Sequence, residues 1–230
     1  MIRAVFLDID NTLLSFSGYV RQTMRAGFQR FGLPPYEEAM FPVFERINNA
    51  LWLRIERGEL TFEELQKIRW DLIFRELGIA FDGPVFEAYF RDQLHVSAIP
   101  EPHARELLAY LSEKYILCAA SNGPYEQQIN RLRLGGMYDC FRHFFLSSRF
   151  GVQKPDAAFF DCCFRELRED GLDGLTPAQT VIIGDSMTSD MAGGIGYGMH
   201  TCLYCPDGRV PSAQGVEHIV TSLEQIREFL

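Results

Sequence analysis

The sequence predicts an α/β fold, in which a parallel, doubly wound sheet carries an all-helical insertion. First, short apolar runs that end in polar turn formers alternate with amphipathic segments. Second, the polar clusters follow the carboxyl ends of these runs, where open α/β sheets bind their ligands. Third, residues 15–97 contain no strand-like run. A chain of 230 residues has room for one such core and a smaller inserted domain.

Apolar runs predict the strands of the sheet. They are short and rich in branched or aromatic residues, which is typical of strands that are buried on both faces of a parallel sheet. The runs cover residues 2–7, 115–120, 143–146, 180–183 and 199–204. The run at 143–146 and the run at 199–204 carry the weaker patterns.

Amphipathic segments predict the helices. Those of the core cover residues 102–113, 124–134, 156–168 and 187–197. The first three begin at or directly after a proline, which fits the first turn of a helix. The helices of the insertion cover residues 19–31, 36–57, 62–77 and 83–94. Thr61 and Glu64 have the spacing of a capping box at the start of the segment 62–77.

Composition and charge exclude several classes of protein. Hydrophobic residues make up 47% of the chain and charged residues 23%, which excludes a disordered or fibrous protein. The formal net charge of −9 disfavours a nucleic-acid polymer as partner, because that polymer is itself an anion. No run approaches the roughly 18 apolar residues of a membrane helix. The first run reaches Asp8 too early for a signal peptide, so we expect a cytoplasmic protein.

The cysteines give little indication of a metal or redox site. In the cytoplasm we expect all six to be reduced. Cys202 and Cys205 have the spacing of zinc ligands, but the sequence holds no second pair of that kind. We therefore expect the cysteines to serve as small buried apolar residues or idle surface thiols.

Asp8 and Asp10 follow the first predicted strand. On an extended chain this spacing places both side chains on one side. Two carboxylates so close repel each other and favour a cation or a proton, and hard oxygen ligands suit Mg²⁺. The alternative is an ordinary turn or helix cap. Asp185 ends another buried run and favours the metal, because three converging carboxylates would otherwise be costly.

Two further segments suit an anion. Ser121, Asn122 and Gly123 end the second predicted strand and precede a helix, where a hydroxyl and backbone N–H groups suit a phosphate. Plain helix capping is the alternative. Lys154 comes before Pro155, which favours an extended backbone that projects the lysine charge from a loop. Taken alone, this segment indicates no more than a surface lysine.

In chain order the motifs are Asp-x-Asp-x-Thr at 8–12, a serine at 121, Lys-Pro at 154–155 and Gly-Asp-x4-Asp at 184–190. This set resembles the haloacid dehalogenase superfamily of phosphatases, whose four motifs are all present in order. Each motif is weak alone, but four in order at matching strand ends are specific. The resemblance covers nearly the whole chain.

The resemblance implies a Rossmann-like catalytic core, residues 1–14 and 98–230, and a small helical cap of the C1 type, residues 15–97. Such a cap would close over the active site, exclude water and contact the leaving group. Phe16 and Trp52 are candidates for contact with a substrate, for example by stacking on a base. In amphipathic helices such aromatic residues usually belong to the core.

The resemblance also implies the catalytic and metal roles. Asp8 would be the nucleophile and form an aspartyl-phosphate. Asp10 would first protonate the leaving alcohol and then activate water. Mg²⁺ would be held by the side chain of Asp8, the backbone carbonyl of Asp10, and Asp185.

The remaining motif residues would bind the phosphoryl group or support the site. By resemblance, Ser121, the backbone of Asn122, and Lys154 would hold the phosphoryl oxygens. Asp190 would brace the metal site or Lys154, and Thr12 would belong to the same supporting group.

The substrate is expected to be a small phosphorylated metabolite. Residues 10–13, 48–52 and 56–61 resemble the bacterial nucleoside 5′-monophosphate phosphatases, often active on pyrimidine and non-canonical nucleotides. The N-acylneuraminate-9-phosphatase group is resembled almost as well, and phosphoglycolate phosphatases, other sugar phosphatases and phosphosugar mutases stay open. Asp10 argues against dehalogenation, because true dehalogenases lack this second acid. A non-catalytic phosphate-binding protein is the alternative from another class. Monomer and homodimer both stay open.

Overall fold

The computed structural model describes residues 1–209 and 213–230 and divides the chain into two compact units. The core unit consists of Met1–Ser15 and Ala98–Leu230, and the helical unit is Phe16–Ser97. The helical unit is therefore inserted into the core unit near its amino terminus.

The two connections to the helical unit are joined to each other within the core unit. The backbone N–H of Ser15 donates to the carbonyl of Ile99 at 2.7 Å. Leu14 forms an antiparallel bridge with Pro100. The chain therefore leaves and rejoins the core unit at a single place.

The core unit is built on a parallel sheet, as the sequence predicts. Its strands are β1 (Ala4–Leu7), β2 (Ile116–Ser121), β3 (His143–Leu146), β4 (Thr180–Gly184), β5 (His200–Tyr204) and β6 (His218–Val220). Their order is β3-β2-β1-β4-β5-β6, with every pairing parallel. The order reverses between β1 and β4. The carboxyl ends of β2, β1 and β4 therefore flank the switch point at which such sheets form a ligand crevice.

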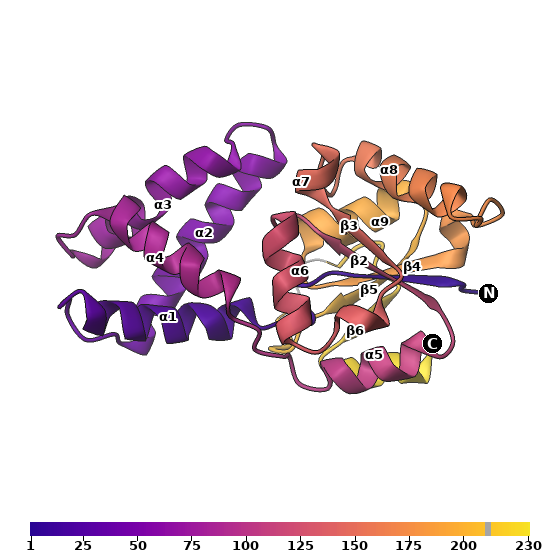
Figure 1. The fold of residues 1–230 in the computed structure, drawn as a ribbon, viewed down its shortest axis with the longest axis horizontal. Helices are drawn as coiled ribbons and strands as arrows, with labels where there is room; N and C mark the ends of the chain where they lie inside the picture. The colour runs from indigo at the N-terminus through magenta and orange to yellow at the C-terminus, as the bar shows by residue number, and fades with distance from the viewer. Residues whose placement is uncertain (210–212) are drawn as a thin grey trace. The chain divides into compact units, whose positions relative to one another are not determined.

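Both faces of the sheet are buried, which explains why the strands appear as continuous apolar runs. In β1, Val5 and Leu7 belong to one apolar cluster, and Ala4 and Phe6 belong to the other. Figure 1 shows α5 (Ala104–Ser112) and α8 (Ala157–Glu169) on opposite faces of the sheet. The predicted doubly wound core is confirmed.

The other core helices are α6 (Tyr125–Leu134), α7 (Ser147–Phe150) and α9 (Ala192–Tyr197). The segment 187–197, predicted as one helix, begins instead with a π-helical turn at Met187–Met191. This turn lies tightly against the end of β4, and a Cβ atom on Gly184 would lie only 2.2 Å from Oδ2 of Asp190. The prediction also missed β6, because three residues with a histidine among them carry too little pattern.

The helical unit contains α1 (Phe16–Arg30), α2 (Phe41–Glu56), α3 (Phe62–Leu77) and α4 (Gly83–His95). The segment predicted at 36–57 divides into a short 3₁₀ turn, Glu38–Met40, and α2. Pro42 explains the division, because a proline has no N–H and suits the first turn of a helix. The capping box is confirmed: Glu64 N–H donates to Oγ1 of Thr61 at 3.2 Å, and Thr61 N–H donates to Oε2 of Glu64 at 2.8 Å.

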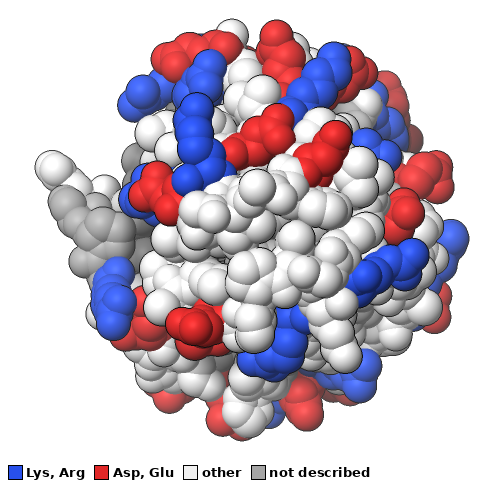
Figure 2. Space-filling model, turned by 90° about the vertical axis from the view of Figure 1, so that its left-hand side faces the viewer, with Lys and Arg blue, Asp and Glu red and all other residues white. Residues whose placement is uncertain are grey.

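A buried ion pair lies inside the helical unit. Arg69 donates to both carboxylate oxygens of Glu87, at 3.0 and 2.6 Å, and to Oδ1 of Asn48 at 3.1 Å. Burial raises the pKa of Glu87, although the charge of Arg69 opposes this shift. Elsewhere the charged side chains are mixed: on the face shown in Figure 2, basic and acidic residues are interspersed.

Two further observations concern the cysteines and the helices. All six cysteines are free thiols. Cys202 is buried in β5, and burial raises the pKa of its thiol to about 12, so it stays protonated at neutral pH. Within 1–209 and 213–230, no helix combines the length and the apolar character that crossing a membrane requires.

Candidate active site

Asp8 and Asp10 lie in the turn that leaves β1. The N–H of Asp8 donates to the carbonyl of Ile183 in β4 at 2.9 Å, so this acid sits at the switch point of the sheet. Asn11 has a φ of 56°, in the left-handed region that asparagine tolerates better than most residues. The turn then closes with a hydrogen bond of 2.8 Å from Asn11 N–H to the carbonyl of Leu14.

The acids at the ends of β1 and β4 converge. Asp8, Asp185 and Asp190 each offer a carboxylate oxygen, and these three oxygens lie within 4.8 Å of one another. The cluster contains only hard oxygen donors, so its chemistry fits a cation such as Mg²⁺. Asp190 is already engaged, because its Oδ1 accepts from Lys154 and its Oδ2 accepts from the N–H of Ser186 at 3.2 Å.

Lys154 is a buried cation that contacts two acids of this cluster, not a surface lysine. Its side chain is 1% exposed, and Nζ donates to Oδ1 of Asp8 at 2.8 Å, to Oδ1 of Asp190 at 2.6 Å and to the carbonyl of Ala120 at 2.5 Å. Asn122 fixes its backbone: Nδ2 donates to the carbonyl of Lys154, and Oδ1 accepts from its N–H, both at 2.9 Å. The loop is thereby attached to the end of β2.

The pKa shifts reflect an excess of buried carboxylates. Burial raises the pKa of Asp8 to about 7, against the opposing charge of Lys154. Burial and the charges of Asp8 and Asp190 raise the pKa of Asp185 well above its ordinary value. Burial alone would lower the pKa of Lys154, but the carboxylates of Asp190 and Asp8 raise it. A divalent cation would relieve this repulsion.

Two residues that the sequence analysis missed contact Asp10. Gln128 Nε2 donates to Oδ2 of Asp10 at 2.6 Å and also to Oγ of Ser121 at 3.0 Å. Arg131 Nη1 donates to Oδ1 of Asp10 at 2.5 Å. Both residues lie on α6, three positions apart. The available signal was this spacing on the helix that follows Ser121-Asn122-Gly123, but the same spacing is common on ordinary polar helix faces.

The other candidate residues lie in different surroundings. Thr12 is fully buried, and its hydroxyl has no hydrogen-bond partner within the described ranges. Phe16 and Trp52 belong to the helical unit. The ring of Phe16 packs among neighbouring aromatic rings, and that of Trp52 lies 5.6 Å from the ring of Phe62. Both therefore take part in packing within their unit.

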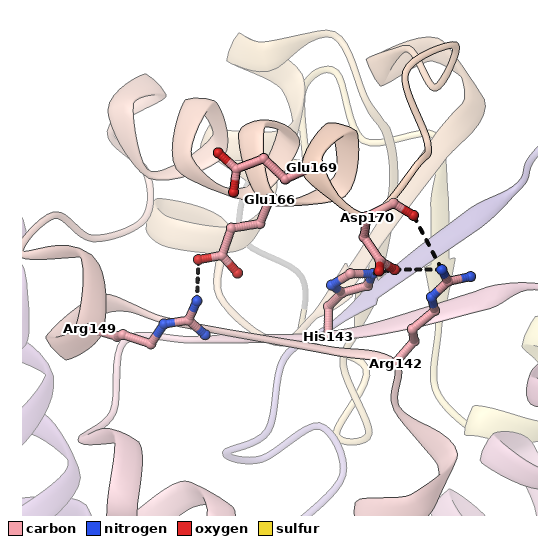
Figure 3. Close-up of a pocket in the computed structure, with 6 residues that line it drawn as sticks. All are labelled: Arg142, His143, Arg149, Glu166, Glu169 and Asp170. Carbon is pink, nitrogen blue, oxygen red and sulfur yellow. Dashed lines mark hydrogen bonds and ion pairs between the residues drawn. The ribbon is translucent and has the colours of Figure 1, made fainter.

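A cavity of about 550 Å³ lies elsewhere on the core unit, beside β3 and α8 (Figure 3). Its charged groups pair with one another: Arg142 Nη2 lies 2.5 Å from Oδ2 of Asp170, and Arg149 pairs with Glu166. It is lined by Arg142, His143, Arg149, Glu166, Glu169 and Asp170, none of which is a predicted site residue. The chemistry of the motifs therefore lies at the switch point and not here.

Comparisons with known proteins agree with this geometry. A family model for haloacid dehalogenase-like hydrolases matches residues 2–198. The HAD-hydrolase YfnB of Bacillus subtilis is 30% identical over 205 residues, which cover 89% of this chain and 85% of YfnB. A crystal structure of YfnB bound to magnesium has a TM-score of 0.88 and 28% identity, covering 99% of this chain and 97% of that one.

Two phosphatases are also similar over most of the chain. The pyrimidine 5′-nucleotidase PynA of Streptococcus pneumoniae is 29% identical over 203 residues, covering 88% of this chain and 83% of PynA. The N-acylneuraminate-9-phosphatase of Mus musculus is 22% identical over 239 residues, covering 100% of this chain and 94% of that protein. With the match to the family model, the parallel core and the inserted helical unit, the conclusion is that this chain belongs to the haloacid dehalogenase-like hydrolases.

Proposed function

We propose that this hydrolase is a Mg²⁺-dependent phosphatase that cleaves nucleoside 5′-monophosphates through an aspartyl-phosphate intermediate. The observation that carries the chemistry is the buried ion pair between Lys154 and Asp8 at the end of β1, beside Asp185. An anionic carboxylate that attacks a phosphate faces strong repulsion. A fixed cation beside the carboxylate offsets this repulsion, so the pair suits such an attack.

Asp8 is the proposed nucleophile. The contact with Lys154 holds its Oδ1 in place. In the first step a carboxylate oxygen of Asp8 forms a bond to phosphorus, and the bond from phosphorus to the alcohol oxygen breaks. Asp10 gives its proton to that oxygen, so the alcohol leaves neutral.

In the second step water attacks the aspartyl-phosphate, and Asp10 takes a proton from the water. The bond between Asp8 and phosphorus then breaks, which restores the carboxylate and releases phosphate. Lys154 stays cationic throughout, because the neighbouring carboxylates raise its pKa. Together with Ser121 and the backbone of Asn122 it is proposed to hold the phosphoryl oxygens.

Mg²⁺ is proposed to be held by Asp8, the backbone carbonyl of Asp10, and Asp185. When bound, it neutralises charge on the phosphoryl oxygens. Asp190 is proposed as a brace, because both of its oxygens already accept hydrogen bonds from Lys154 and Ser186. Buried Thr12 supports the turn after β1 in the same scheme.

The substrate class is proposed from the relatives. PynA, a pyrimidine 5′-nucleotidase, is 29% identical to this chain, whereas the mouse N-acylneuraminate-9-phosphatase is 22% identical. A sugar-acid phosphatase is the second candidate because that relative matches along the full chain. We propose the helical unit as the cap that controls substrate access, with Phe16 and Trp52 as candidate contacts for the leaving group.

The test is phosphate release from a panel of phosphomonoesters with Mg²⁺ and with a chelator. The panel contains UMP, dUMP, dTMP, purine nucleotides, sugar phosphates, phosphoglycolate and N-acylneuraminate 9-phosphate, and Asp8→Asn is the control. We expect Mg²⁺-dependent release with the highest kcat/KM for a pyrimidine nucleotide, and no release by the variant. Preference for N-acylneuraminate 9-phosphate would refute the nucleotide assignment. Equal rates for the wild type and Asp8→Asn would refute the chemistry.

A further inference from the structure

The carboxyl group of Asp10 is held at both of its oxygens. Oδ1 accepts from Nη1 of Arg131 at 2.5 Å, and Oδ2 accepts from Nε2 of Gln128 at 2.6 Å. Two donors at two different oxygens fix the plane of the carboxyl group as well as its position. Each oxygen keeps a further lone pair, so either can still carry or receive a proton.

The two donors form a built arrangement rather than a surface contact. Gln128 and Arg131 are each 1% exposed. Their spacing of three on α6 places them on the same helix face. Nη1 of Arg131 also donates to Oε1 of Gln128 at 2.8 Å, which orients the amide so that its NH₂ group points to Asp10.

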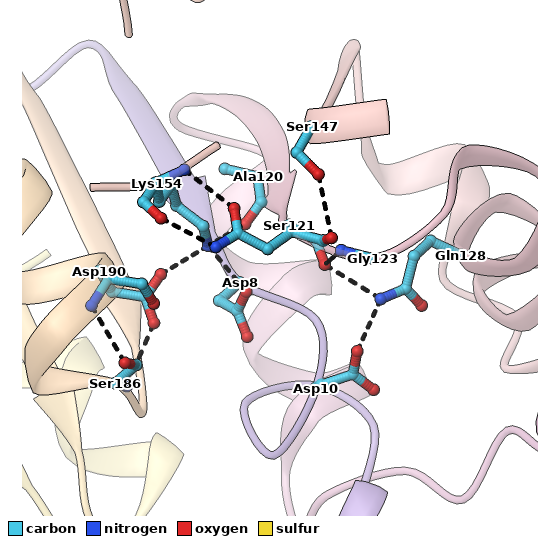
Figure 4. A network of polar contacts seen from close by, with 12 residues as sticks. Asp8, Asp10, Ala120, Ser121, Gly123, Gln128, Ser147, Lys154, Ser186 and Asp190 are labelled. Carbon is cyan, nitrogen blue, oxygen red and sulfur yellow. Dashed lines mark hydrogen bonds and ion pairs between the residues drawn. The ribbon is translucent and has the colours of Figure 1, made fainter. Parts of the chain in front are cut away.

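The same amide connects Asp10 to Ser121. Gln128 Nε2 lies 3.0 Å from Oγ of Ser121, and that Oγ accepts from the N–H of Gly123 at 3.1 Å. Gly123 leaves the space for this contact, because a Cβ atom there would lie 2.4 Å from Nε2 of Gln128. Figure 4 shows Gln128 between Asp10 and Ser121.

We propose that Arg131 and Gln128 are positioning residues that orient the carboxyl group of Asp10 for proton transfer to the leaving group. This inference rests on the proposed phosphatase function, in which Asp10 gives a proton to the alcohol oxygen and later receives one from water. Neither donor touches the phosphoryl group in this scheme. The effect of Arg131 on the rate passes through Asp10, whereas Gln128 also holds Oγ of Ser121.

The alternative is a purely structural role, in which Asp10 serves only to neutralise a buried arginine. The two roles differ in how the rate responds to the leaving group. A good leaving group such as 4-nitrophenol departs without a proton, whereas phenol departs far more readily when it is protonated. Loss of positioning therefore slows phenyl phosphate more than 4-nitrophenyl phosphate. A structural defect slows both to the same extent.

The experiment compares kcat/KM for phenyl phosphate and 4-nitrophenyl phosphate in the wild type, Arg131→Met, Arg131→Lys and Gln128→Met. We use kcat/KM because it reports the first step even when hydrolysis of the intermediate limits kcat. General acid catalysis contributes about 10²- to 10⁴-fold, so we expect Arg131→Met to lose about 10- to 100-fold on phenyl phosphate and less than about threefold on 4-nitrophenyl phosphate. Arg131→Lys keeps one donor and restores part of the loss.

Arg133→Met is the matched control, with the same substitution on the same helix. Arg133 is exposed and lies over the ring of Tyr138. We expect both of its kcat/KM values to stay within about twofold of the wild type. If Arg131→Met does not fold, as judged by its thermal transition, the two phenyl esters are compared in Gln128→Met instead. This variant removes a neutral amide and leaves the arginine paired.

A double-mutant comparison tests whether Arg131 acts through Asp10. If it does, Asp10→Asn and Asp10→Asn with Arg131→Met have the same kcat/KM. A further loss in the double variant, or an equal loss on both phenyl esters in the single variants, overturns the inference. The proposed function fails separately, if the wild type hydrolyses no phosphomonoester or if Asp8→Asn retains full activity.

Discussion

Replacing Lys154 with methionine removes the cation that stabilises the acidic cluster. The change deletes a side chain that is 1% exposed, together with its contacts to Asp8, Asp190 and the carbonyl of Ala120. Removing one partner of a buried pair costs about 3–5 kcal/mol. Burial already raises the pKa of Asp8 to about 7, so a proton can take over part of the lost charge balance. We therefore expect Lys154→Met to lower the free energy of unfolding by about 3 kcal/mol at neutral pH.

The loss depends on pH in a defined direction. The pKa of Asp8 is raised from 3.8 to about 7 in the folded metal-free protein, so the folded state binds more protons than the unfolded chain across that window. Stability contributed by such a group falls as pH rises. Without Lys154 the pKa of Asp8 rises further, so the pH range in which the folded state binds more protons than the unfolded chain extends to higher pH. The penalty of Lys154→Met is therefore larger at about pH 8 than at about pH 5.

The assay is thermal and urea unfolding of the metal-free wild type and variant at several pH values. For a chain of this size, about 3 kcal/mol corresponds to a lowering of the Tm by about 6–12 °C. Lys67→Met, at an exposed position of α3, is the control and should change the Tm little. A penalty under about 1 kcal/mol, or one that does not change with pH, would refute the argument that Lys154 balances buried carboxylates.

Four further predictions concern other contacts of the structure. Asp185→Asn removes one of the crowded carboxylates, so it should raise the Tm of the metal-free protein and weaken Mg²⁺ binding, both measurable by calorimetry. In the wild type, Mg²⁺ binding should release protons, because the pKa values of Asp8 and Asp185 are raised. For the same reason this binding should weaken as the pH falls below about 7. Gly123→Ala should displace the Gln128 amide, whose Nε2 would lie 2.4 Å from the new Cβ, and lower kcat/KM by about 10-fold with little change in Tm; an unchanged rate would contradict this. Arg69→Met leaves a buried carboxylate unpaired in the helical unit and should lower the unfolding free energy by about 3 kcal/mol, as measured by urea titration, with less loss at low pH.

Local pattern was sufficient to predict five of the six strands and the motif positions. The strands at Ala4–Leu7 and Thr180–Gly184 are buried on both faces, so every residue carries the apolar signal, and the acids follow where that signal stops. The helix predicted at 62–77 matches α3, because a capping box and Gly78, with a φ of 68°, mark its two ends chemically.

What local pattern alone does not predict depends on packing between distant segments. Lys154 looks like a surface lysine in its own segment and was assigned to the site only by the resemblance, and the fold brings it against Asp8 and Asp190. Arg131 follows Asp10 by 121 positions, and nothing in α6 itself distinguishes it from Arg133. The π-helical turn at Met187–Met191 likewise carries Asp190 close against the end of β4, a fit that no local pattern records.

The junction at Ser15 and Ile99 gives the fold a modular construction. Because the outgoing and returning chains are joined to each other inside the core unit, the intervening residues are not needed to hold these two ends together. The inserted segment is thus the exchangeable part of the fold, and the core unit is the constant part. Another segment can therefore stand in this place while the core unit keeps its fold, provided that the new segment returns its two ends to the same bridge.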